Sequence, residues 1–266
     1  MTVSTAFDEI AETYDAAFTN SATGSAQRKT VWKEIDRTFT AGQRVLEINC
    51  GTGVDALHLA ARGVQVTACD SAPRMIAVAR GRAEVAAHSV MVDFRVLANE
   101  RIETLQREGP FDGIFSNFSG LNCIPDLSLL GGDLAQLLKG RGKMVVCLFG
   151  RFCAWEMFWY LSQGNVRKAV RRFMPGERPA TLSGSSEFNI WYHSVRALKK
   201  AFTPHFRLLA WKGVGLAVPP SYLDFLVAGH PHLFRLASEV DPWLGECPGF
   251  RAMADHMLLV FERIAR

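Results

Sequence analysis

The stretch that decides the fold is Val45 to Gly53, which reads VLEINCGTG. It begins as an apolar strand and runs directly into a turn that holds Gly51 and Gly53, after which a helix is predicted from Val54. Glycine lets the backbone of such a turn approach a ligand closely, because it has no Cβ. The first turn of the following helix also offers unpaired N–H groups. Nucleotide-binding folds of several kinds use this arrangement.

On both sides of this stretch, short apolar runs alternate with helical segments. Helices are predicted at 54–62, 73–87, 102–107 and 126–138, the last ending near Gly140, and strands at 44–50, 65–70, 91–97, 111–118, 143–149, 206–218 and 256–264. Strands separated by helices of this length form βαβ units in a mostly parallel sheet. Right-handed crossovers then place helices on both faces. The predicted fold is therefore a doubly wound α/β domain with a mostly parallel, seven-stranded sheet.

The second half of the chain departs from this alternation in two places. Residues 151–192 hold an aromatic run, a basic run and a loop rich in Pro, Gly and Ser over 174–186, before an expected strand at 187–193. Residues 219–250 hold a helical stretch that Pro231 and Pro242 are expected to break. We interpret residues 1–266 as a single domain with a core over 41–150. The segments 151–192 and 219–250 are then helical insertions that form a cap and shape an acceptor pocket.

Composition narrows the class of protein. Hydrophobic residues make up 48% of the 266 residues, which is enough for a sizeable core. The net charge of +4 is too weak to imply nucleic acid as a partner without a clustered basic patch. The six cysteines form no C-x-x-C pair, and Cys50, Cys69 and Cys147 lie in apolar strands, which favours buried free thiols. With neither a signal peptide nor a membrane-length apolar run evident, a cytoplasmic location is expected.

Two acidic residues make the glycine turn more specific. Glu47 lies two residues before the turn, and Asp70 lies at the end of the second predicted strand. An acidic side chain at the second position can accept hydrogen bonds from the ribose hydroxyls of an adenosine ligand. Asn49 stands where glycine is commonest, and asparagine tolerates a left-handed backbone. The third glycine of the dehydrogenase fingerprint G-x-G-x-x-G is absent, which disfavours that alternative.

In this order and spacing, VLEINCGTG, VTACD and FDGIFSNFSGLN resemble class I S-adenosylmethionine-dependent methyltransferases. The segment FDEIAETYDAAF, residues 7–18, is similar to the leader that many of them carry. The resemblance covers about residues 7–149, with weaker echoes in 192–202 and in the closing strand. It implies S-adenosyl-L-methionine as the cofactor and an N-terminal helical lid over residues 1–40.

The resemblance also implies the roles of particular residues. Glu47 would hold the methionine amino group, the ribose would bind Asp70, and Asn99 would contact the adenine in place of the Asp that many members have. Asn117 would lie near the sulfonium and the acceptor, and Tyr14 would fold over the cofactor. The full set of implied cofactor-binding residues is Tyr14, Glu47, Asn49, Gly51, Gly53, Asp70, Ser71, Asn99 and Asn117.

The acceptor side is less defined by sequence. His193 and Asn117 are the candidate catalytic residues. His193, in WYHS, would be a general base, and a structural, hydrogen-bonded histidine is the alternative. His230 and His232 flank Pro231, but no carboxylate or cysteine nearby completes a set, so no metal site is expected. An aromatic helix and a basic helix could together dock on an anionic membrane or hold a lipid-like acceptor; packing onto the sheet and a solvated face are the alternatives. Their residues are Phe152, Trp155, Phe158 and Trp159, and Arg167, Lys168, Arg171 and Arg172.

Methyl transfer from a sulfonium requires the protein mainly to align the acceptor and exclude water. A hydroxyl or ammonium acceptor also needs a base. We therefore predict methyl transfer to O, N, S or C of a small, partly apolar metabolite, with no nucleic acid as a partner. Methylation of RNA or protein is an alternative, which the proline-free sequence SNFS at 116–119 disfavours for base amines. A non-catalytic, cofactor-binding partner module is the other alternative.

Overall fold

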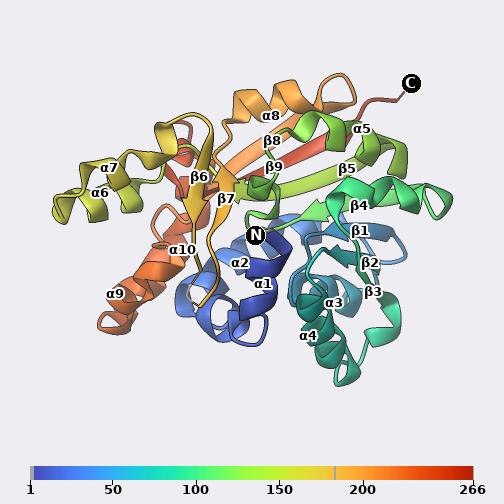
Figure 1. Ribbon diagram of the computed structural model, residues 1–266, viewed down its shortest axis with the longest axis horizontal. Coiled ribbons are helices and arrows are strands. Elements are labelled where there is room, and N and C mark those ends of the chain that lie inside the picture. Colours follow the sequence, from blue (N-terminus) through green and yellow to red (C-terminus); the bar gives the residue numbers. More distant parts are fainter. Residues whose placement is uncertain (1–2, 183, 266) are drawn as a thin grey trace.

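A computed structural model describes residues 3–182 and 184–265, and its centre is a seven-stranded sheet (Figure 1). The strand order is β3-β2-β1-β4-β5-β9-β8. The five strands β1 to β5 are parallel, and β9 runs antiparallel between β5 and β8. This confirms the predicted mostly parallel sheet. The strands are β1 (Arg44–Ile48), β2 (Gln65–Asp70), β3 (Val92–Val96), β4 (Phe111–Ser116), β5 (Leu138–Phe149), β8 (Phe206–Val214) and β9 (His256–Arg263).

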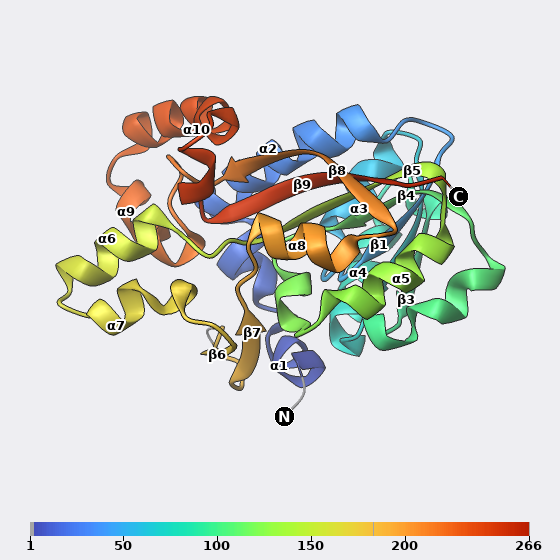
Figure 2. The same cartoon turned by 90° about the horizontal axis from the view of Figure 1, so that it is seen from above.

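Helices cover both faces of the sheet, as the doubly wound prediction requires. One face packs against α2 (Ala22–Thr38), α3 (Val54–Ala61) and α4 (Pro73–Glu84) through buried residues such as Ile35, Leu59 and Ile76. The other face packs against η3 (Asn99–Arg107), α5 (Leu127–Leu137) and α8 (Val195–Phe202) through Leu134 and Phe202. Figure 2 shows α2 and α8 on opposite sides of β8 and β9. Short helical turns, η2 (Ser89–Met91) and η4 (Gly120–Cys123), complete this half.

Three differences from the sequence prediction have a clear physical cause. The strand predicted at 143–149 begins at Leu138, directly after the helix, because Leu138 is buried and already pairs with Phe111 in the sheet. Pro242 does not break its helix, which continues to Glu246. Asp241, just before it, accepts hydrogen bonds from the backbone N–H groups of residues 215–218 and so holds this part of the helix against the chain that follows β8. The loop expected at 174–186 contains a strand, because residues 177–180 pair with 188–191.

The N-terminal segment folds over the carboxyl ends of the strands. It consists of α1 (Val3–Ile10), η1 (Asp15–Thr19) and α2. The hydroxyl of Thr52, in the glycine turn, donates to Asp15 over 2.8 Å, and Asp15 also pairs with Arg82 of α4. The backbone N–H of Arg74, at the start of α4, donates to Asp8 over 2.7 Å. The lid is therefore anchored both to the turn and to the helix that follows β2.

The two insertions pack together at one end of the molecule, where they form the cap (Figures 1 and 2). The buried Arg172 pairs with Glu156 over 2.9 Å and with Asp255 over 2.7 Å, which ties the first insertion to the start of β9. The rings of Trp159 and Phe225, one from each insertion, lie 5.5 Å apart. The elements of the cap are α6 (Ala154–Ser162), α7 (Val166–Ala169), η5 (Arg171–Phe173), β6 (Glu177–Ala180), β7 (Phe188–Trp191), η6 (Ser221–Leu223), α9 (Asp224–Ala228), α10 (Pro231–Glu246) and η7 (Arg251–Met253). Among the described residues, no helix is long and apolar enough to span a membrane.

Candidate active site

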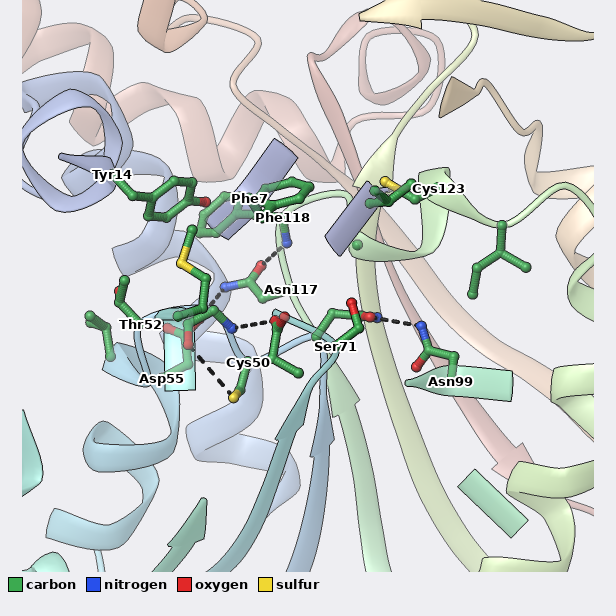
Figure 3. A pocket seen from close by; sticks show the side chains of 18 of the residues that line it. Phe7, Tyr14, Cys50, Thr52, Asp55, Ser71, Asn99, Asn117, Phe118 and Cys123 are labelled. Atoms are coloured by element: carbon green, nitrogen blue, oxygen red, sulfur yellow. Dashed lines mark hydrogen bonds between the residues drawn. The ribbon is translucent and has the colours of Figure 1, made fainter. Parts of the chain in front are cut away.

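A cleft lies at the carboxyl ends of β1, β2 and β4, beneath the lid (Figure 3). Its empty space is about 890 Å³ when the open mouth is included. Ligands of open parallel sheets bind at this edge because the loops that follow the strands diverge there. Most of the residues predicted to bind the cofactor line the cleft, although they come from separate parts of the chain. These are Tyr14, Asn49, Gly51, Asp70, Ser71, Asn99 and Asn117.

The glycine turn has a left-handed backbone at three positions, and its two glycines have different surroundings. The φ angles are 58° at Asn49, 54° at Gly51 and 74° at Gly53. A Cβ added at Gly51 would meet no protein atom within 4 Å, and Gly51 lines the cleft. A Cβ added at Gly53 would lie 2.6 Å from the ring of Phe94, and Gly53 is not among the lining residues. Gly51 therefore keeps space open at the ligand side, whereas Gly53 lets the loop pack against the core.

Asp70 is fixed by backbone hydrogen bonds at the end of β2. Its Oδ2 accepts from the N–H of Gly51 and its Oδ1 from the N–H of Ala72, each over 2.9 Å. Burial raises the pKa of the Asp70 carboxyl, and the hydrogen bonds from Ala72 and Gly51 oppose that rise. Each carboxylate oxygen can accept more than one hydrogen bond. Asp70 is thus a preorganised acceptor that can also bind a pair of ligand hydroxyls.

Glu47 and Arg28 leave two buried polar atoms without partners among the described residues. The Oε2 of Glu47 and the Nε of Arg28 accept or donate no hydrogen bond. Burial, followed by the charge of Asp55, raises the pKa of Glu47 well above its ordinary value, and Arg28 opposes this effect. Buried polar groups are nearly always satisfied in native proteins. Arg28 lines the cleft, whereas Glu47, also predicted to bind the cofactor, is not among the lining residues. A free acceptor and a free donor that interact electrostatically fit the ammonium and carboxylate groups of an amino acid.

Asp55, to which sequence analysis assigned no role, organises this end of the cleft. Its carboxylate receives hydrogen bonds from Arg28 Nη1 over 2.5 Å, Trp32 Nε1 over 2.7 Å and Asn117 Nδ2 over 2.9 Å. The first two donors come from the lid helix α2 and the third follows β4 (Figure 3). Neither Arg28 nor Asp55 belongs to a recognisable motif. Only the folded chain brings them together.

Asn99 lies at the other end of the cleft from Tyr14, with Ser71 between them in the view of Figure 3. The side-chain amide of Asn99 donates to Asn49 Oδ1 over 2.7 Å, and Asn49 Nδ2 donates to Ser116 Oγ over 3.2 Å. This chain of amides links the turn after β1 to the residue after β3. It leaves the carbonyl oxygen of the Asn99 side chain available to accept from an adenine amino group.

Aromatic side chains cover the lid side of the cleft. The ring of Tyr14 lies 6.5 Å from that of Phe7 and 5.8 Å from that of Phe18. Phe118 has a φ of 43°, which is unusual for a bulky residue, and its ring packs edge-on against Phe18 and lies 4.8 Å from the guanidinium of Arg28. Burial raises the pKa of Tyr14 to about 12, so its hydroxyl remains protonated and can donate.

His193 is not among the residues that line the cleft. It forms a hydrogen bond with the backbone of Ile124, which does line the cleft, and an isolated bridge with Gly150, just after β5. Burial lowers the pKa of His193, a hydrogen bond with the backbone of Ile124 opposes this, and Nε2 is buried without a partner. A role as general base remains a prediction. His230 and His232 are exposed, and the described part of the chain holds no group of three metal-ligating side chains.

The sequence and the fold of this chain are similar to those of known proteins. Residues 45–142, which contain the glycine turn, Asp70, Asn99 and Asn117, match the family model described as a methyltransferase domain. Residues 45–142 are thus a methyltransferase domain, and the chain has the Rossmann-like fold of class I methyltransferases. Its matched core is shared with a ubiquinone biosynthesis O-methyltransferase of Xanthomonas oryzae pv. oryzae, 36% identical over 115 residues. That of Xylella fastidiosa is 35% identical over 151 residues.

These matches are partial, because they cover 43% and 55% of this chain and 46% and 60% of the two relatives. The chain thus spans about half the length of the curated relatives it matches. Whole-chain likeness comes from solved structures at low identity. The CcbJ methyltransferase of Streptomyces caelestis has a TM-score of 0.64 at 16% identity, over 98% of this chain and 99% of that one. The [4+2]-cyclase SpnF, with a TM-score of 0.57 at 19% identity over 90% and 81%, shows that this fold hosts more than one reaction.

Proposed function

We propose that this methyltransferase domain binds S-adenosyl-L-methionine and transfers its methyl group to a small, partly apolar acceptor. The observation that carries the proposal is a set of unsatisfied or preorganised groups in and beside one cleft. Asp70 lines the cleft with carboxylate oxygens that backbone N–H groups hold in place, while Glu47 and Arg28 hold an unpartnered acceptor and donor. The zwitterionic and ribose ends of an adenosyl amino acid need these groups.

The residues divide into two sets around the reacting centre. At the adenosine end, Asp70 binds the ribose, and Asn99 accepts from the adenine. At the amino-acid end, Glu47 holds the ammonium group, and Arg28 donates to the carboxylate. When bound, S-adenosylmethionine supplies a methyl group activated by a positively charged sulfur.

Between these ends, the side-chain amide of Asn117 donates to Asp55 and accepts from the backbone N–H of Phe118. These two hydrogen bonds fix the orientation of the amide. Tyr14 and Phe118 cover the lid side and exclude water from the reacting atoms. The protein's contribution is then mainly alignment, since the leaving group is already activated.

The acceptor end of the cleft is apolar. Its lining includes Val3 and Phe7 of the lid helix and Phe118, Cys123 and Ile124 from the segment after β4. Such a wall suits an acceptor with a flat or branched hydrocarbon body and a single reacting heteroatom. The naming of the partial relatives as O-methyltransferases supports oxygen as that atom. A hydroxyl acceptor must lose a proton. Our candidate to receive it is His193, which forms a hydrogen bond with the backbone of Ile124 in the cleft wall.

Isothermal calorimetry tests the cofactor assignment without a known acceptor. The wild type should bind S-adenosylmethionine and S-adenosylhomocysteine, and Asp70→Asn should weaken both by at least about tenfold, the loss expected for about 1.4 kcal/mol of hydrogen bonding. Asp112→Asn is the matched control. Asp112 lies near the start of β4, at the edge of the sheet opposite the cleft, and pairs with Lys139. An unchanged affinity in Asp70→Asn, or no binding by the wild type at millimolar concentrations, would disprove the assignment.

A further inference from the structure

The first insertion ends in a protruding surface that the methyl-transfer site does not use. We name residues 158–174 the cap tip; it comprises most of α6, the whole of α7 and η5 (Figures 1 and 2). In both views it extends beyond the sheet at the end of the molecule farthest from α5. We propose that the cap tip is a docking surface for a membrane that contains anionic phospholipids.

The cap tip is unusually apolar for a solvent-facing surface. Six of the eighteen exposed large hydrophobic side chains among the described residues lie within its 17 residues. Phe158 is 67% exposed, Val166 60% and Leu161 45%, and Val170, Phe173 and Met174 complete the set. Single exposed apolar residues are common, but a gathered set of this kind marks an interaction site.

The rest of the aromatic helix is used in packing, which shows that these exposed residues are a separate face. Trp155 donates from its indole N–H to the carbonyl of Leu216 over 2.9 Å, and Trp159 packs edge-on against Phe225. One face of α6 therefore packs against the segment after β8 and the second insertion, and not onto the sheet as predicted. Phe158 and Leu161, three residues apart, share the other face.

The charge of the cap tip is of one sign. Residues 157–176 contain Arg167, Lys168, Arg171 and Arg172 and no acidic residue. Two carboxylates flank this stretch. Glu156 is 1% exposed and is already paired with Arg171 and Arg172, whereas Glu177, at the start of β6, is exposed and accepts a hydrogen bond from Asn189. Arg167 and Lys168 remain exposed on α7. The surface thus offers apolar side chains and cations together, with no exposed anion of its own.

This combination favours an anionic membrane over a second copy of the chain. A two-fold interface built on the cap tip would gather Arg167 and Lys168 of both copies in one interface to which the cap tip contributes no exposed carboxylate, so like charges would repel. An anionic phospholipid surface satisfies both features, because cations bind the headgroups while aromatic and aliphatic side chains enter the interface. The helix α10 also has exposed apolar residues, but it exposes the carboxylates of Glu239 and Glu246 as well, and an anionic membrane would repel these.

Vesicle co-sedimentation of the full chain tests the proposal, with phosphatidylcholine vesicles compared with mixed phosphatidylcholine–phosphatidylglycerol vesicles. We expect binding to the mixed vesicles only, weakening as salt is raised. Each cation near such a surface strengthens binding about fivefold, so Arg167→Gln with Lys168→Gln should weaken it about 25-fold. Phe158→Ser with Leu161→Ser should also reduce it. The control is Leu129→Ser, which removes a 77% exposed leucine on α5, remote from the cap tip.

Three results would overturn the proposal: no binding to the mixed vesicles, equal binding to both vesicle types, or tip variants that bind as the wild type does. Analytical ultracentrifugation covers the competing explanation. A concentration-dependent dimer that the tip substitutions abolish would assign the surface to a second copy instead. Calorimetry with S-adenosylmethionine on the same variants separates this proposal from the proposed function, because the tip substitutions should leave that affinity unchanged.

Discussion

Alanine at Gly51 and alanine at Gly53 should fail in different ways, although the two glycines lie in one turn and share a left-handed backbone. The φ angles of 54° and 74° impose a similar cost on any residue with a Cβ, about 1–2 kcal/mol each. The surroundings differ. The new methyl group at position 51 meets no protein atom, whereas at position 53 it would lie 2.6 Å from the Phe94 ring and 2.9 Å from Ala79.

The magnitudes follow from these contacts. Overpacking a core position costs about 1–3 kcal/mol, so Gly53→Ala should destabilise the protein by about 2–5 kcal/mol in total. Gly51→Ala should cost only the backbone share, about 1–2 kcal/mol. For a chain of this size each kcal/mol lowers the melting temperature by about 2–4 °C. Gly51→Ala places its methyl group in the cleft and should therefore weaken S-adenosylmethionine binding by about tenfold or more.

Urea unfolding measures the free energy of each variant, and calorimetry at a temperature where both are folded measures their affinity. The expected pattern is a stable Gly51→Ala that binds poorly and an unstable Gly53→Ala that binds nearly as well as the wild type. Wild-type affinity in Gly51→Ala would show that the ligand does not approach this turn. Wild-type stability in Gly53→Ala would show that the Phe94 contact does not constrain it.

Two further predictions concern buried charges. Below the raised pKa of Glu47, S-adenosylmethionine binding should release a proton, because the ligand's ammonium favours the ionised carboxylate, so affinity should rise with pH through that range. Calorimetry in buffers of different ionisation enthalpy detects this release, and Glu47→Gln should abolish it; proton release that persists in the variant contradicts the reasoning. Arg172→Met should lower the free energy of unfolding by about 3–5 kcal/mol, because Asp255 loses its buried arginine partner and Glu156 keeps only Arg171. Burial alone would raise the pKa of Glu156, but Arg172 and Arg171 outweigh it and lower that pKa, so the loss should shrink in acid as the carboxyl protonates; a loss of equal size at all pH values would count against this account.

Local patterns in the sequence were sufficient for the core of the fold. Apolar runs of strand length separated by amphipathic helices predicted the parallel strands β1 to β5, because alternation of this kind can be buried only in a sheet covered on both faces. The turn at 49–53 and Asp70 were visible for the same reason, since the backbone geometry and the strand end that position them are encoded within a few residues. Pro231 was identified as a break, although Pro242 was wrongly given the same role.

Contacts between distant segments were decided only by the tertiary structure. Arg28 and Asp55, 27 residues apart, form the ion pair beside Asn117, and nothing in either local sequence predicts it. Arg172 likewise joins the first insertion to Asp255, 83 residues later. Such pairs depend on which helix covers which strand end, and this follows from packing of the whole chain. The sequence by itself therefore determined the part of the cleft that holds the glycine turn and Asp70. The folded chain determined the end that holds Arg28 and Asp55, the aromatic cover and the exposed cap tip.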